Sequence, residues 1–247
     1  MGNGVLRTQR NAEAALSSEE QPHLADHSGG YTPAVEDYLK AIYTLQQRGD
    51  SVSTNALCVQ LGGIKPGSVS GMLRQLEERG LIVHQLYRGA RLTPVGERVA
   101  LVTVRNHRLL ETFLVEALGY SWDEVHTEAE ALEHHISSKL AARIAAWLGE
   151  PTADPHGDPI PQADGSLPCC GDQRLCDAPI GRSLVVVRVL DQDANRLRYL
   201  SELGLTPGAV CTVDARAPFD GPLQLRVAGV THPLDARLAQ YIVIREQ

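Results

Sequence analysis

Carboxylate and imidazole side chains in the middle of the chain have the spacing of a metal site. At about 100° per residue, Glu130, Glu133 and His134 fall within one narrow sector of a helix, and His126 lies one turn earlier on the same side. Acidic groups crowded into one sector repel one another unless a cation neutralises them. The spacing therefore predicts either a divalent metal site or a solvated acidic face, and it leaves both open.

Two features favour the metal site: the presence of His126 in the same sector as the other three residues, and a polar pair on the preceding helix. His107 and Glu111 are four residues apart on a helical stripe that is otherwise apolar, including Val104 and Leu114, so both polar groups need a partner. Asp37 points away from the apolar stripe of its own expected helix. That face of the helix is free to meet another helix.

The elements around Asp37 have the order of a winged helix-turn-helix. Helical spacing of apolar residues and the positions of capping residues, Pro and Gly predict three helices, over 35–45, about 53–61 and 66–80. Strand-like segments at 81–87 and 91–93 flank Arg88-Gly89-Ala90, a hairpin turn or wing. Such a module binds DNA or serves only as a packing unit, and the basic residues on its third helix favour DNA.

In this layout the third helix enters the major groove of DNA. Arg can donate two hydrogen bonds to guanine, while Ser and a helix N-terminus suit phosphate. We expect DNA contacts from exposed residues of the third helix and the wing: Lys65, Pro66, Ser68, Ser70, Arg74, Gln75, Tyr87, Arg88 and Arg91.

A second helical block follows. Periodicity predicts two long helices over roughly 96–118 and 122–148, the second beginning at a capping box, Ser121 to Glu124. Leu132, Ile136 and Leu140 lie opposite the acidic sector and suit packing or dimerisation.

Composition limits the class of protein. The chain has 247 residues, a net charge of −7 and 43% apolar residues, which indicates a globular protein of one large domain or two to three small ones. No apolar run approaches the ~18 residues of a membrane helix, and the N-terminus has no secretory pattern. The five cysteines form no disulfide framework, so we expect a cytoplasmic protein.

Charge and loop-forming residues divide the chain. Residues 31–100 carry a small excess of basic side chains and 101–150 an excess of acidic ones, which indicates an anionic and a cationic partner respectively. Residues 1–30 have the composition of a disordered tail. Six Pro and four Gly between Pro151 and Gly181 exclude a helix there. Cys169, Cys170 and Cys176 lie in this region, and we interpret them as free thiols rather than a zinc site with His156.

Four separate motifs resemble one family. Residues 35–43 (VEDYLKAIY), 106–111 (NHRLLE), 130–135 (EALEHH) and 154–161 (DPHGDPIP) are similar, in order and spacing, to the DtxR/MntR family of metal-activated bacterial transcriptional regulators. From about residue 180 the chain is similar to the SH3-like, FeoA-type domain of many members.

The resemblance implies a mainly α fold with small β parts. We expect a disordered tail at 1–30, a winged helix-turn-helix domain at 31–96, a helical dimerisation and metal-binding domain at 97–162, a linker at 163–179 and an SH3-like β-barrel at 180–247.

The resemblance also implies metal ligands. Asp37, Glu130, Glu133 and His134 fall on the primary metal-site positions, and His107, Glu111 and His126 fall on the ancillary positions of iron-type members. The oxygen donors Asp37 and Glu130 stand where iron-type members have Met and Cys. Hard oxygen donors favour Mn²⁺, so manganese is expected first and Fe²⁺ second.

Two positions, 40 and 71, depart from relatives, and the candidate ligands of the C-terminal domain match them only approximately. Lys40 stands where manganese-type members have a second carboxylate, which argues against a shared two-metal cluster. Its ammonium group replaces part of the missing positive charge or points to solvent. Gly71 stands where some relatives have a base-contacting Gln. Recognition of the operator is therefore expected to depend more on neighbouring residues and on DNA shape. Ligands from the C-terminal domain have only approximate candidates, Asp191, Gln192 and Asp193.

The function implied is a metal-dependent repressor of metal-uptake genes, acting as a homodimer on a palindromic operator. Without metal, the charges of Asp37 and the 130–134 cluster are expected to keep them apart. A metallohydrolase is one alternative, although the chain has no His-Glu-x-x-His helix. An adaptor whose C-terminal domain binds a transport protein is the other.

Overall fold

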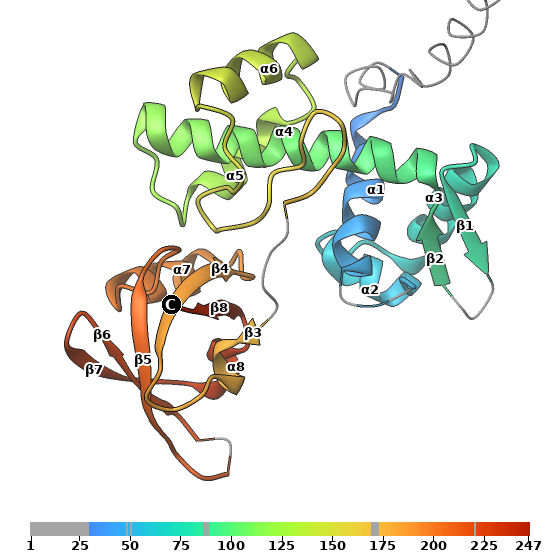
Figure 1. The fold of residues 1–247 in the computed structure, drawn as a ribbon. Coiled ribbons are helices and arrows are strands. Elements are labelled where there is room, and N and C mark those ends of the chain that lie inside the picture. The colour runs from blue at the N-terminus through green and yellow to red at the C-terminus, as the bar shows by residue number, and fades with distance from the viewer. Residues whose placement is uncertain (1–29, 48, 50, 86–88, 169–172, 220) are drawn as a thin grey trace, which may run out of the picture.

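The computed structural model describes residues 30–47, 49, 51–85, 89–168, 173–219 and 221–247. The chain forms an N-terminal unit of helices and a hairpin, a helical middle unit and a C-terminal unit built on a sheet (Figure 1). The tail expected at 1–30 lies, apart from Gly30, outside the described residues. No described helix is long and apolar enough to cross a membrane.

The N-terminal unit has the elements of the predicted winged helix-turn-helix. It consists of α1 (Pro33–Gln46), α2 (Thr54–Gln60), α3 (Pro66–Glu78) and the antiparallel strands β1 (Ile82–Gln85) and β2 (Gly89–Leu92). The Ser53 hydroxyl accepts a hydrogen bond from the Ala56 amide at 3.1 Å and caps α2 as expected. The third helix begins at Pro66, and Gly80 follows its end with φ of 69°.

The long helix α4 (Pro94–Leu118) connects the first two units. The Thr93 hydroxyl caps its first turn by accepting a hydrogen bond from the Gly96 amide, and Gly119 ends it in the left-handed conformation. Only glycine fits at position 96, because a Cβ there would lie 1.9 Å from the Leu81 carbonyl oxygen. Helix α1 packs across α4, so one continuous element supports both units (Figure 1).

The expected single helix at 122–148 is wrong. The segment forms two shorter helices, α5 (Val125–Leu132) and α6 (Ser138–Trp147), and the chain turns between them. The Ser137 hydroxyl starts α6 by accepting a hydrogen bond from the Leu140 amide at 3.2 Å. The expected capping box is also wrong, because the Ser121 hydroxyl donates to the Glu124 carboxylate and caps no amide of α5.

The C-terminal unit is a six-stranded antiparallel sheet in the order β3-β8-β4-β5-β6-β7. Its elements are β3 (Gln173–Arg174), the 3-10 helix η2 (Leu175–Asp177), β4 (Ser183–Val189), α7 (Ala194–Glu202), β5 (Val210–Arg216), β6 (Leu223–Val227), β7 (Val230–Leu234), α8 (Ala236–Ala239) and β8 (Ile242–Glu246). Among the described residues the edge strands β3 and β7 do not pair, so the expected closed barrel is not formed. The last residues of the expected linker differ too, because β3 and η2 belong to this sheet unit.

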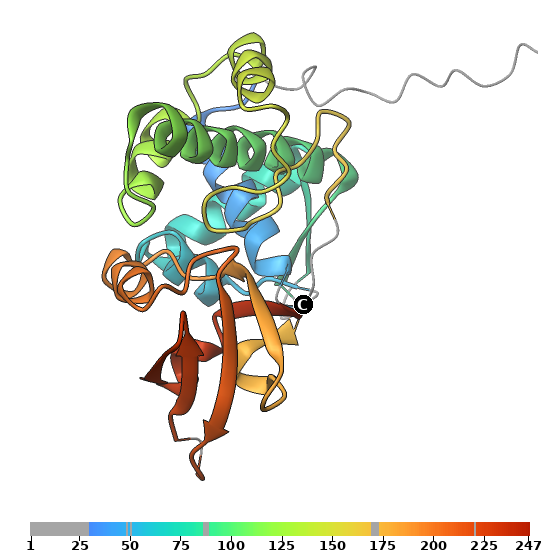
Figure 2. The same cartoon turned by 60° about the vertical axis from the view of Figure 1, so that its left-hand side comes forward.

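The loop 154–161 lies between the middle unit and the sheet (Figure 2). The Val189 amide of β4 donates a hydrogen bond to the His156 carbonyl at 2.8 Å. Close packing requires Gly157, since a Cβ there would lie 2.1 Å from the Val187 carbonyl oxygen. Trp122, which precedes α5, packs against the C-terminal core and stacks on the His156 ring. The sheet unit is thus docked beside α5.

Candidate metal centre

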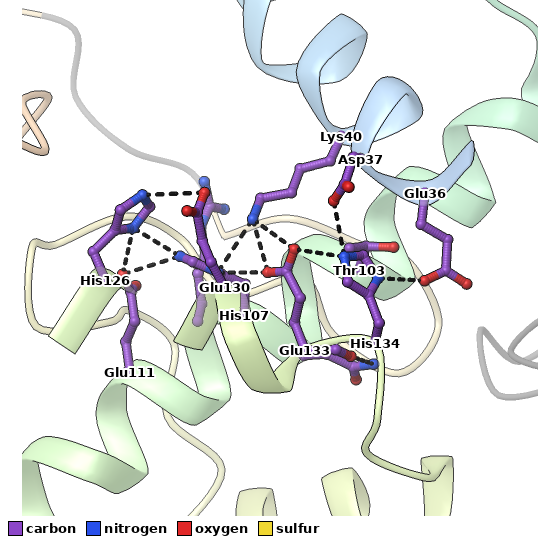
Figure 3. A network of polar contacts seen from close by, with 12 residues as sticks. Glu36, Asp37, Lys40, Thr103, His107, Glu111, His126, Glu130, Glu133 and His134 are labelled. Carbon is purple, nitrogen blue, oxygen red and sulfur yellow. Dashed lines mark hydrogen bonds and ion pairs between the residues drawn. The ribbon is translucent and has the colours of Figure 1, made fainter. Parts of the chain in front are cut away.

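Three of the predicted ligands meet where α1 faces the turn that follows α5 (Figure 3). Asp37 Oδ1 lies 2.8 Å from His134 Nε2, and Glu133 Oε1 lies 3.4 Å from the same nitrogen. The three residues can offer one ligand atom each within 4.8 Å of one another. Because α5 ends at Leu132, the turn that follows aims Glu133 and His134 towards α1. We call these residues the Asp37 group.

Glu36 was not predicted at this site. Its carboxylate lies 2.6 Å from His134 Nδ1, the ring nitrogen opposite Asp37. Burial disfavours the charged imidazole, but Glu36, Asp37 and Glu133 outweigh it and raise the pKa of His134. A carboxylate at this nitrogen fixes the ring orientation and leaves the other nitrogen for a ligand. The one sign in the sequence that Glu36 could take part was its position directly before Asp37.

A second set of predicted ligands lies between α4 and α5. His107 Nε2 is 3.0 Å from both Glu111 Oε1 and His126 Nδ1, and His126 Nδ1 is 3.1 Å from Glu111 Oε1. We call these three residues the Glu111 group. Burial opposes ionisation of Glu111, yet the surrounding histidines hold its pKa well below the usual range.

Glu130 lies apart from the Asp37 group, although the resemblance of the chain to the family assigned it to the same metal site. Its side chain is 56% exposed, and Oε1 lies 3.4 Å from His126 Nε2. The hydrogen bond from His126 lowers the pKa of Glu130 to about 2. The structure therefore brings Glu130 to the outer side of the Glu111 group.

Lys40 points into the centre and not to solvent. Its ammonium donates to Glu133 Oε2 at 2.7 Å and Oε1 at 2.9 Å. Burial raises the pKa of Glu133. The hydrogen bond from His107 and the charge of Lys40 have the larger effect, and they lower the pKa below its usual value. Lys40 and His134 thus bridge α1 and the turn after α5.

A buried third group was missed from the sequence. Glu111, Asp154 and His156 offer ligand atoms within 4.8 Å of one another. His156 Nε2 donates to the Trp122 carbonyl at 2.7 Å, while Nδ1 has no hydrogen-bond partner among the described residues. Complete burial, with the nearby charge of Glu111, raises the pKa of Asp154 well above its usual value. The 154–161 motif was the available sign, but its fold against Glu111 was not predictable from spacing.

The Asp37 group and the Glu111 group line one cavity of about 880 Å³, and Asp154 of the third group lines it too. Of the approximate candidates in the C-terminal unit, Gln192 lines it. Asp191 binds Arg196 at 2.7 Å, and Asp193 caps α7 by accepting a hydrogen bond from the Arg196 amide.

His156, which the sequence analysis considered as a zinc ligand together with the cysteines, lies in this centre. Cys176 is a free thiol, whereas Cys169 and Cys170 lie outside the described residues.

The donor atoms fit a hard or intermediate divalent cation. The Asp37 group supplies carboxylate oxygens and one imidazole nitrogen, and none of its three members has a sulfur atom. Carboxylate and imidazole donors suit Mn²⁺ and Fe²⁺, whereas softer ions prefer sulfur. The residues therefore fit a divalent ion of this class.

The predicted DNA-contacting residues of α3 lie on its exposed side. Val69, Leu73 and Leu76 fill the core behind them. The exposed set is Lys65, Pro66, Ser68, Ser70, Arg74 and Gln75, and Gly71 lies on the same side. Arg91 is exposed on β2, whereas Tyr87 and Arg88 lie outside the described residues.

Sequence profiles of three domains match the chain in succession. They are the iron dependent repressor N-terminal DNA binding domain at 31–90, the iron dependent repressor metal binding and dimerisation domain at 93–162, and the FeoA domain at 173–246. The iron-dependent repressor IdeR of Mycobacterium tuberculosis is 34% identical over 191 residues, which cover 72% of this chain and 83% of the relative. The chain belongs to the DtxR/MntR family of metal-dependent transcriptional regulators.

Manganese regulators are also similar to this DtxR/MntR-family chain. The transcriptional regulator MntR of Lysinibacillus sphaericus is 34% identical over 114 residues, 46% of this chain and 81% of the relative. The structure of a manganese-dependent transcriptional repressor in complex with manganese has a TM-score of 0.81 and 43% identity, covering 86% of this chain and all of that one.

The protein is therefore a metal-dependent, DNA-binding transcriptional repressor of the DtxR/MntR family and not an enzyme. These relatives and structures are named as regulators, which decides against the metallohydrolase. The DNA-binding profile likewise decides against an adaptor whose helices only dimerise.

Proposed function

We propose that Mn²⁺ activates this repressor and that its targets are metal-uptake genes. The observation that carries the proposal is the position of Asp37 on α1, 2.8 Å from His134 beyond α5. The Asp37 group joins the DNA-binding unit to the helical unit with oxygen and nitrogen donors only. Similarity to manganese-dependent repressors supports the choice of metal.

Asp37, Glu133 and His134 form the primary site in this proposal, and Glu130 completes it by a side-chain rotation from its exposed position. His107, Glu111 and His126 form the ancillary site. Asp37 and Glu133 would hold the ion between α1 and the turn after α5, beside the Lys40 ammonium that pairs with Glu133. The bound ion supplies two positive charges at that junction.

In this proposal, metal binding acts on DNA recognition by fixing the orientation of α3. Helix α1 packs on α4 and lies beside α2, so fixing its end against α5 fixes the recognition helix relative to the helical unit. Because the ion binds the DNA-competent arrangement more tightly, DNA must raise metal affinity by the same factor. We assign DNA contacts to Lys65, Pro66, Ser68, Ser70, Arg74, Gln75, Arg88 and Arg91.

We further propose a homodimer on a palindromic operator. Large apolar side chains are exposed on the helical unit, among them Leu118, Leu132, Leu140 and Trp147. A two-fold dimer through this surface would present two copies of α3 about 34 Å apart, one turn of DNA. Since the target is chromosomal DNA, we place the protein in the cytoplasm.

The decisive experiment measures binding of a labelled operator fragment by fluorescence anisotropy, after chelation and after addition of Mn²⁺. The operator is first selected from random duplexes with the Mn²⁺-loaded protein. We expect Mn²⁺ to tighten binding at least about tenfold, a coupling of about 1.4 kcal/mol. Equal binding after chelation contradicts the proposal. Activation by Fe²⁺ at lower concentration under anaerobic conditions identifies iron instead, and sedimentation of the complex gives the number of subunits.

A further inference from the structure

Lys40 lies between the two proposed metal positions (Figure 3). Its ammonium contacts both oxygens of Glu133, from the Asp37 group, and lies 3.2 Å from Nδ1 of His107, from the Glu111 group. The Lys40 side chain is 19% exposed and that of Glu133 is 1% exposed. The ammonium is therefore a largely buried positive charge placed among ligand-type atoms.

The two nitrogens of His107 face opposite sides. Nδ1 lies 2.5 Å from Glu133 Oε2, and Nε2 lies 3.0 Å from Glu111 Oε1. Without Lys40, Glu133 and His107 Nδ1 would supply a carboxylate and an imidazole to a position between the two groups. Such a pair is a partial metal site of the same donor class as its neighbours.

We propose that Lys40 is a tethered cation that fills this middle position. It keeps a divalent ion from binding between Glu133 and His107, and it ties α1 to the helical unit when no metal is bound. The two metal positions of the proposed function then stay separate and do not merge into one cluster. This inference rests on the proposed function, because it concerns the ions that activate the repressor.

Charge and geometry support both roles. An ammonium in direct contact with Glu133 strongly repels a divalent ion at the same point, and the burial of Glu133 weakens the screening of this repulsion by solvent. A charge-assisted hydrogen bond to a buried carboxylate is among the stronger polar contacts. Lys40 belongs to α1 and Glu133 follows α5, so this bond joins the same two elements as the Asp37 group.

The first test counts metal ions. Full-length wild-type protein, Lys40→Glu and the control Lys139→Met, which removes an exposed lysine on α6, are dialysed against Mn²⁺ and analysed for bound ions per chain. We expect Lys40→Glu to bind one ion more than the other two. Electron paramagnetic resonance of the Mn²⁺-loaded variant should show the signal of coupled neighbouring ions. An unchanged ion count without such a signal overturns the exclusion role.

The second test needs no metal and no activity. Hydrogen exchange of the amides in α1 is compared in chelated wild type, Lys40→Met and Lys139→Met. Because Lys40→Met keeps the length of the side chain and removes its charge, we expect α1 to exchange at least about tenfold faster only in this variant. Equal exchange in all three proteins overturns the tether.

Failure of this inference can be told apart from failure of the proposed function. If wild-type DNA binding requires Mn²⁺ but the Lys40 variants match wild type in ion count and exchange, only the role of Lys40 is wrong. If wild-type protein and Lys40→Glu bind no Mn²⁺, the proposed function fails and the exclusion role fails with it.

Discussion

Asp37 and His134 are 97 residues apart in the chain, yet Asp37 Oδ1 and His134 Nε2 lie 2.8 Å from each other. The contact joins the first helix of the DNA-binding unit to the turn after α5. Lys40 and Glu133 make a second bridge beside it. The junction between these units is therefore held by side-chain charges that a metal ion would share.

Replacing Asp37 should weaken metal binding while the protein stays folded. Asp37→Asn keeps an oxygen and a similar shape but removes the negative charge that attracts a divalent ion. We expect Mn²⁺ affinity, measured by titration calorimetry, to fall at least about tenfold, or about 1.4 kcal/mol. Glu128→Gln removes an exposed carboxylate on α5 and serves as the control. Equal losses in the two variants would show a general charge effect and no specific ligand.

Arg74→Ala should weaken DNA binding without changing metal binding. Arg74 is exposed on α3, on the side opposite its buried apolar residues. Loss of a base contact from this side chain costs about 1–3 kcal/mol and relaxes specificity at one base pair. Operator affinity with Mn²⁺ present is the measurement. Arg79→Ala, beyond the C-terminal end of the same helix, should have a smaller effect.

The stability of the chelated protein should fall as pH rises. Burial lowers the pKa of His126, but its hydrogen bonds to Glu111 and Glu130 outweigh burial and raise the pKa from 6.5 to about 9. A raised pKa in the folded state gives stability that is fully present below pH 6.5 and lost as pH rises through 9.

We expect a loss of up to about 3 kcal/mol from this group between these pH values, measured by urea unfolding with chelator. The slope should be shallower in His126→Gln and unchanged in His232→Gln, which removes a histidine on β7. Mn²⁺ affinity should change in the opposite direction, because imidazole ligands must lose their protons. A stability that rises towards pH 9 in the chelated wild type contradicts this assignment.

Gly157→Ala should loosen the C-terminal unit. An added Cβ would lie 2.1 Å from the Val187 carbonyl oxygen, and the φ of 84° disfavours any side chain. We expect about 2 kcal/mol of destabilisation. In a Trp147→Phe background, Trp122 is the remaining tryptophan, and its emission should shift to the red as the ring loses its contact with His156.

The contrasting variant is Arg198→Ala, which removes the 2.9 Å ion pair to Asp123. Because Arg198 is half exposed, its loss should cost at most about 1 kcal/mol and leave the emission of Trp122 nearly unchanged. A larger effect from Arg198 than from Gly157 would mean that the ion pair, and not backbone packing, holds the unit in place.

Local signals in the sequence determined the elements and the kinds of ligand. Ser53 and Pro66 mark helix starts because their effects act within one turn, and the motifs around Asp37, His107 and His134 identified the family. Periodicity relates a side chain only to its own helix. It could not show that the helix ends at Leu132 and the chain turns there, since a continuous apolar pattern fits one helix as well as two.

Packing between elements decided the rest. Which carboxylate receives the ammonium of Lys40, why Glu130 stays outside the Asp37 group and how His156 reaches Glu111 all depend on the crossing of α1, α4, α5 and the 154–161 loop. These relationships join residues that are far apart in the chain, and their distances follow from how the helices pack and where the loop docks. A single sequence specifies that packing only through the whole fold.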